Sequence, residues 1–137
     1  MKNRLKQLII EAAAQAHAKG LLPSAAFPEV NLEEPKLGAH GDFATNFAMV
    51  SAALQKTAPH KIAEAIVDQI IDSHRLLEKV EIAGPGFINF YVTPAAWHPV
   101  LLDIRAADRR YGASELGRGE RVQVEFVSSN PTGPLHV

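Results

Sequence analysis

The chain has 137 residues with 14 Lys and Arg against 15 Asp and Glu, 47% hydrophobic residues and no cysteine. This composition is typical of a globular protein, and the length suits one domain with a core, or one domain with a short appendage. The lack of cysteine excludes disulfide frameworks, thiolate metal sites and cysteine nucleophiles. The balanced charge excludes a massed basic surface for nucleic acid, so any RNA contact has to be local and shape-based.

The chain is expected to begin with a helix. Its apolar residues recur at the spacing of one helix face, and Gly20 favours a helix end after them. The residues of this face are Leu5, Leu8, Ile9, Ala12, Ala13 and Ala16.

The next stretch, residues 21–46, is rich in Pro and Gly and predicts irregular structure with short strands at 30–32 and 41–45. Two helices are expected after it, over residues 47–54 and 59–71, because apolar residues again follow a helical spacing.

A hairpin is the strongest local prediction. Residues 77–83 and 87–92 alternate between apolar and polar side chains and are separated by a turn with two glycines. Thr93 is then placed to cap a last helix that extends to Tyr111. The order α-β-β-α-β-β-α predicts an α+β fold in two layers, an antiparallel sheet with helices on one face.

The end of the chain has a different character. Residues 112–120 are polar and glycine-rich and indicate a linker, whereas residues 121–126 alternate like a new strand. We therefore expect one domain over 1–111 and the truncated first strand of a second domain over 121–137. No segment has the roughly 20 apolar residues of a membrane span, so a soluble, cytoplasmic protein is expected.

The second hairpin strand is the first candidate site. Phe87, Asn89 and Tyr91 share the face opposite the one that the helices are expected to cover. An exposed aromatic ring beside a hydrogen-bonding side chain is how a sheet binds an unstacked base. Gly84 and its turn have almost no side-chain bulk, so a backbone could approach closely. The alternative is that these aromatic rings fill a second layer against residues 21–40.

The last residues are the second candidate site. A strand leads into a loop rich in hydroxyl and amide groups and then a histidine, and ligands of open sheets bind at such strand ends. Glu125 offers a negative charge for a cationic group. The polar side chains of the loop include Ser128 and Asn130, and the histidine is His136. The alternative is a solvated turn.

Three runs of residues share one resemblance. Val124–Val137 resembles the segment leading into the HxGH signature of the arginyl-tRNA synthetases, class I enzymes in which Gly and His come next. The runs Gly41–Asn46 and Ile82–Phe90 resemble upstream segments of the same family. The match covers the whole chain in the right order.

The resemblance implies a division of labour. Residues 1–111 resemble the family's N-terminal additional domain, which meets the D-loop at the elbow of the tRNA. Phe87 and Asn89 match the aromatic and amide positions that the family uses against a D-loop base. This implication favours the binding interpretation of the hairpin face over the packing alternative.

The resemblance also assigns the last residues to a Rossmann-type catalytic domain. By position, Glu125 and Asn130 match residues that hold the substrate arginine, and Ser128 is expected in the same pocket. His136 matches the first signature histidine, which stabilises charge on the ATP phosphates as the adenylate forms.

The implied partners are tRNA(Arg), arginine and ATP, with Mg accompanying the ATP and no metal ligand from this chain. The parent enzyme is expected to be a monomeric arginine–tRNA ligase, and this chain alone is expected to be inactive. The histidines show no metal-binding spacing. The alternative function is a non-catalytic α+β domain that binds RNA or a protein, for which the last residues are incidental.

Overall fold

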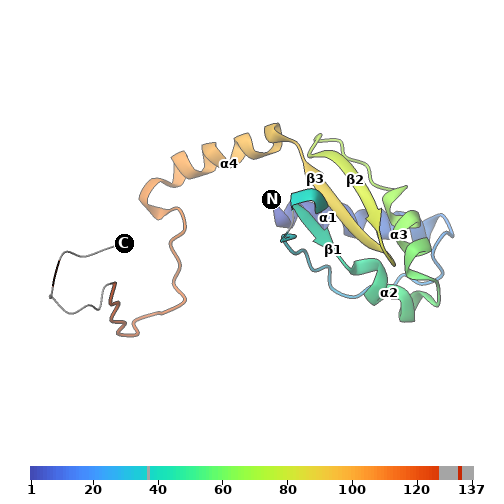
Figure 1. Cartoon of the computed structure of the whole chain (residues 1–137), viewed down its shortest axis with the longest axis horizontal. Coiled ribbons are helices and arrows are strands. Elements are labelled where there is room, and N and C mark those ends of the chain that lie inside the picture. The colour runs from blue at the N-terminus through green and yellow to red at the C-terminus, as the bar shows by residue number, and fades with distance from the viewer. Residues whose placement is uncertain (37, 127–132, 134–137) are drawn as a thin grey trace. The chain divides into compact units, whose positions relative to one another are not determined.

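The computed structural model describes residues 1–36, 38–126 and 133 of the chain. Contacts divide the chain into two units, Met1–Leu102 and Asp103–Val137. Within the described residues the elements are, in chain order, α1 (Lys2–Ala18), η1 (Gly38–His40), β1 (Phe43–Thr45), α2 (Phe47–Gln55), α3 (Pro59–Val67), β2 (Leu77–Ala83), β3 (Phe87–Val92), α4 (Pro94–Ala107) and η2 (Asp108–Arg110) (Figure 1).

The sheet is antiparallel, with its strands in the order β1-β3-β2, so β3 has a neighbour on both sides. The hairpin of β2 and β3 confirms the prediction from the two alternating runs. Helix α1 passes behind the strands in Figure 1, and the buried residues of α1 and α3 belong to one apolar cluster with those of β3. The architecture of this unit is therefore the expected α+β arrangement.

The core lies between the helices and one face of the sheet. The predicted stripe of α1 is buried, apart from the half-buried Leu8, and Ile88 and Phe90 of β3 belong to the same apolar cluster. Each such side chain contributes about 1.5–3 kcal/mol when it is fully buried. Because Ile88 and Phe90 face the helices, the alternating residues of β3 lie on the other face of the sheet.

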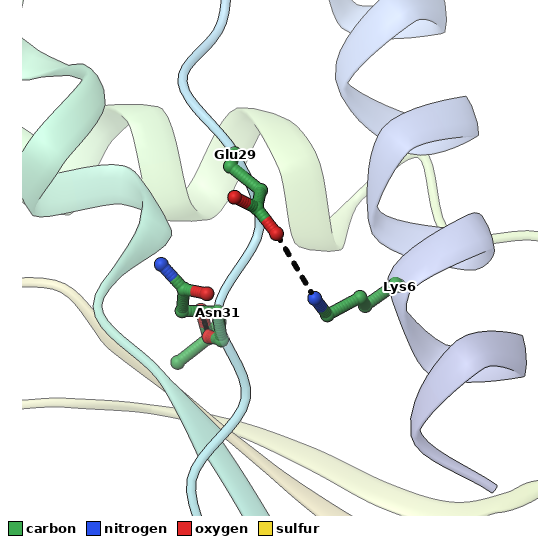
Figure 2. Close-up of polar contacts among 4 residues, drawn as sticks. Lys6, Glu29 and Asn31 are labelled. Carbon is green, nitrogen blue, oxygen red and sulfur yellow. Dashed lines mark hydrogen bonds and ion pairs between the residues drawn. The ribbon is translucent and has the colours of Figure 1, made fainter. Parts of the chain in front are cut away.

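The segment between α1 and β1 is contacted by both of these elements around residues 29–31. Figure 2 shows Lys6 of α1 reaching Glu29 of this segment, with 3.4 Å between the Lys6 Nζ and Glu29 Oε1 atoms. Two residues further, the Asn31 carbonyl accepts a hydrogen bond of 2.6 Å from the Thr45 hydroxyl. The same hydroxyl accepts the Phe47 N–H at 3.2 Å, so Thr45 also contacts the first residue of α2.

Three sequence-based expectations differ from the structure. Residues 30–32 form no strand, and this part of the segment contributes only an isolated bridge between Glu33 and Ala44. Residues 121–126 are exposed and not in a strand, because no described neighbour pairs with them. Tyr111 lies beyond α4, which ends at Ala107. The order within the described residues is therefore α-β-α-α-β-β-α.

Candidate nucleic-acid interface

The candidate interface is the face of the sheet opposite the helices, which we call the open face. Along β3 it carries Phe87, Asn89 and Tyr91. Across the β2–β3 ladder these residues pair with Ala83, Glu81 and Lys79, respectively. The open face is thus lined by two neighbouring rows of side chains.

Phe87 is at the accessible end of this face. Its residue surface is 40% exposed, and its partner across the ladder is Ala83, which has only a methyl group. The pairing of β3 with β1 starts one residue later, at Ile88 with Thr45. The ring of Phe87 is therefore not part of a second packed layer. Phe27 of the 21–40 segment stacks instead on Phe47, with the ring centroids 5.8 Å apart.

The expectation that Asn89 is bare is wrong, because the residue is only 5% exposed. It lies at the middle of the central strand, opposite Ala44 on one side and Glu81 on the other. The Asn89 side-chain amide makes no hydrogen bond with any residue that the structure describes. A largely covered amide without a protein partner needs water or a ligand to satisfy it.

Tyr91 is half-buried and tied into a polar network rather than bare. Its hydroxyl donates a 2.7 Å hydrogen bond to Glu81 Oε2, and the Lys79 ammonium lies 5.1 Å from the centre of its ring. The same ammonium bridges to Glu81 Oε1. Sequence reasoning missed Lys79 and Glu81 as site residues, although their alternation in 77–83 already placed them together on one face.

The network shifts three pKa values. The hydrogen bond to Glu81 raises the pKa of the Tyr91 phenol and also that of the Lys79 ammonium. Hydrogen bonds from Lys79 and then Tyr91 lower the pKa of the Glu81 carboxyl. The carboxylate is therefore held in its charged, acceptor-only form.

The two glycines of the hairpin turn have different surroundings. Gly84 is exposed, has a φ of +52°, and a Cβ added to it meets nothing within 4 Å. Gly86 is buried with a φ of +137°, and a Cβ there comes within 2.9 Å of the Pro59 carbonyl carbon. The close backbone approach expected at this turn is thus made by α3 at Gly86, while Gly84 leaves open space beside the interface.

The second candidate site lies mostly outside the described residues. Glu125 is described and exposed. Ser128, Asn130 and His136 fall among the residues that the structure does not describe. Their arrangement around arginine or ATP therefore stays a prediction.

Two kinds of feature are absent from the described part of the chain. No group of three or more His, Cys, Asp or Glu side chains within it could hold a metal ion. Nor does any helix in that part have the length and apolarity to cross a membrane.

Comparison with solved structures defines the class of fold. A crystal structure of arginyl-tRNA synthetase from Plasmodium falciparum matches with a TM-score of 0.54 at 17% identity, over 68% of this chain and 16% of that chain. At this identity the likeness concerns the fold alone. The family model "Arginyl tRNA synthetase N terminal domain" matches residues 3–92, and the chain belongs to this family.

The similar curated proteins carry a consistent name. "Arginine--tRNA ligase" of Desulfosudis oleivorans is 59% identical over 100% of this chain. The proteins of the same name from Desulforamulus reducens and Geotalea uraniireducens are 51% and 48% identical over the whole chain. The chain spans 25% of the first of these relatives and 24% of the other two.

Proposed function

We propose that the chain is the N-terminal part of an arginine–tRNA ligase and that its open face docks the tRNA. Family membership and the shared name of the relatives support the first statement. The proposal includes the domain division expected from the sequence, with a docking domain over 1–111, a linker over 112–120 and the start of a catalytic domain over 121–137.

The observation that carries the docking proposal is the pairing of two side chains on the open face. The Phe87 ring is 40% exposed, and two residues along the strand the Asn89 amide has no hydrogen-bond partner among the described residues. Base-on-ring stacking is worth about 1–3 kcal/mol, and an amide can bind a base edge through both a donor and an acceptor. Tyr91 is the next residue of β3 on the open face and extends this surface. The open space at Gly84 admits a nucleotide backbone.

The proposed parent reaction joins arginine to tRNA(Arg). ATP, accompanied by Mg, reacts with arginine to give arginyl-adenylate and pyrophosphate, and the arginyl group then passes to the terminal ribose of the tRNA. In this proposal Glu125, Asn130 and Ser128 hold the arginine, since a carboxylate suits the guanidinium group. His136 stabilises charge on the ATP phosphates. Residues 121–126, which are in no strand in this chain, form the first strand of a Rossmann-type domain in the full-length protein. The parent protein acts as a cytoplasmic monomer.

Substitution of the exposed ring tests the docking proposal. In the full-length protein, Phe87→Ala removes the stacking surface, and we expect the Kd for a tRNA(Arg) transcript to rise at least about tenfold. Leu54→Ala is the control, because Leu54 is an apolar side chain of α2 that is 48% exposed and does not belong to the open face. Fluorescence anisotropy measures the binding and thermal unfolding checks the fold. Equal tRNA affinity of both variants and the wild type contradicts the proposal.

A further inference from the structure

We propose that Glu81 selects the base that stacks on Phe87, because its carboxylate accepts a hydrogen bond from an exocyclic amino group. The proposal rests on the docking function of the open face and adds a specificity-determining residue to it. The expected ligand is an unpaired RNA base with an amino group, and cytosine is favoured over uracil.

The register of the sheet places Glu81 within reach of such a base. Glu81 pairs directly with Asn89, and Phe87 is the next residue of β3 on the same face. Direct cross-strand neighbours have Cβ atoms about 4.5–5.5 Å apart, and diagonal neighbours are about 7–8 Å apart. A base that covers the Phe87 ring therefore has both Asn89 and Glu81 along its edge.

The carboxylate of Glu81 is oriented before any ligand arrives. The Tyr91 hydroxyl donates to Oε2 at 2.7 Å, and the Lys79 ammonium contacts Oε1. The Glu81 side chain is nevertheless 41% exposed. An ionised carboxylate has about four lone-pair sites, so two such contacts leave acceptor capacity toward the open face.

Base chemistry gives the direction of the preference. Cytosine presents an N4 amino donor where uracil presents the O4 carbonyl, so a carboxylate attracts the first and repels the second. Lys79 offsets the negative charge of Glu81, which reduces its repulsion of the RNA phosphates.

Two pyrimidines provide the decisive test, since they differ little in stacking surface. The probes are fluorescein-labelled RNA pentamers with sequence UUCUU and UUUUU, titrated with the 137-residue chain at one salt concentration. We expect UUCUU to bind about tenfold more tightly. In Glu81→Gln, the new side-chain amide both donates and accepts hydrogen bonds. The Kd values of the two pentamers are therefore expected to differ by less than about twofold. Glu78→Gln is the control, because it removes an exposed carboxylate from the same strand.

The outcomes separate the two proposals. If the wild-type chain binds UUCUU and UUUUU with nearly equal Kd values, and Phe87→Ala still loses binding, the role of Glu81 is overturned and docking stays intact. An equal loss of preference in the Glu78 and Glu81 variants assigns the effect to net charge and also overturns the inference. If Phe87→Ala binds both pentamers as the wild type does, docking on the open face is itself wrong.

Discussion

At the scale of single residues, the open face shows how neighbouring side chains set the properties of one another. Tyr91, Glu81 and Lys79 are all solvent-accessible, yet their mutual contacts raise the pKa of Tyr91 and lower that of Glu81. Isolated surface ion pairs contribute little to stability. The consequence of this network is orientation, because it fixes a carboxylate next to the Asn89 amide.

The pKa of Tyr91 tests this network. Glu81→Gln removes the carboxylate whose hydrogen bond is the main cause of the raised pKa. In a Tyr111→Phe background, where Tyr91 is the one tyrosine left, we expect the phenol to titrate above pH 10.0 and Glu81→Gln to lower that midpoint. The ultraviolet absorbance of the phenolate measures it. An unchanged midpoint contradicts the hydrogen bond.

The directions of the Tyr91 and Glu81 pKa shifts determine how their contributions to stability depend on pH. A raised pKa at Tyr91 means that its contribution is complete below pH 10.0 and is lost as the pH rises through the raised value. A lowered pKa at Glu81 means that its contribution is complete above pH 4.5 and is lost as the pH falls through the lowered value. The network is therefore intact between these limits.

Sequence reasoning succeeded for Phe87 and failed for Asn89 for a physical reason. Alternation assigns side chains to one of two faces of a sheet, and both residues are on the predicted face. It carries no information on which strand is central. Because β3 lies between β1 and β2, Asn89 at its middle is covered from both sides, whereas Phe87 near its start is not.

At the scale of elements, α2 illustrates how a buried polar side chain can hold a loop. Gln55 is fully buried and its amide is satisfied by the segment that follows α1. It accepts the Ser24 N–H at 3.1 Å and donates to the carbonyls of Ser24 and Ala26, each at 3.0 Å. By contrast, the buried Ser51 hydroxyl on the same helix has no hydrogen-bond partner among the described residues.

These two residues make a matched pair for stability measurements. Gln55→Leu leaves three backbone groups unpaired, so we expect a loss of about 2 kcal/mol or more in the free energy of unfolding. Ser51→Ala removes an unpartnered hydroxyl, and we expect a change within about 0.5 kcal/mol. Denaturant unfolding measures both. Equal losses contradict the role of Gln55 in holding the segment.

The hairpin turn offers a second matched pair. Gly86→Ala places a Cβ 2.9 Å from the Pro59 carbonyl carbon at a φ of +137°, and we expect a loss of about 3 kcal/mol. Gly84→Ala meets open space at a φ of +52°, so only the backbone term of about 1 kcal/mol applies. Thermal unfolding of both variants checks the difference. If Gly84→Ala is the more damaging change, the packing of α3 against the turn is wrong.

Element prediction was reliable where periodicity reflects packing. The stripe of α1 follows from burial against the core, and the structure confirms it. The structure also confirms the hairpin of β2 and β3 that the alternating runs predict. Residues 30–32 and 121–126 alternate equally well but form no strand. Alternation cannot supply a paired backbone: beside β1 the segment that contains residues 30–32 forms only the bridge at Glu33, and no described backbone pairs with residues 121–126.

At the scale of the whole molecule, the chain matches only part of the length of its relatives. It spans 25% of its Desulfosudis oleivorans relative, and α4 exposes large apolar side chains such as Leu101 and Leu102. The sequence resemblance identified the family, and the comparisons confirm it: the family model matches residues 3–92, and the Desulfosudis oleivorans relative aligns with the whole chain. Physical reasoning from the residues alone predicted the α+β fold that the structure has, and it led to the proposal of a base-binding face, but it gave no amino acid specificity.

The parent activity is expected to depend on the rest of the enzyme. We expect the 137-residue chain, supplied with arginine, ATP, Mg and tRNA(Arg), to give no ATP–pyrophosphate exchange above background. The full-length protein is the positive control in the same assay. Exchange by the chain alone contradicts the proposed division between a docking domain and a catalytic domain.

The most direct test of the account is an NMR titration of the chain with tRNA(Arg), observed at its side-chain amides. Docking on the open face predicts that the Asn89 amide signals shift or broaden, because a base fills its missing hydrogen bonds. The Gln55 amide, fully buried and already satisfied, is the internal reference and is expected to shift far less. An unchanged Asn89 signal with shifts gathered on α2 and α3 contradicts the account.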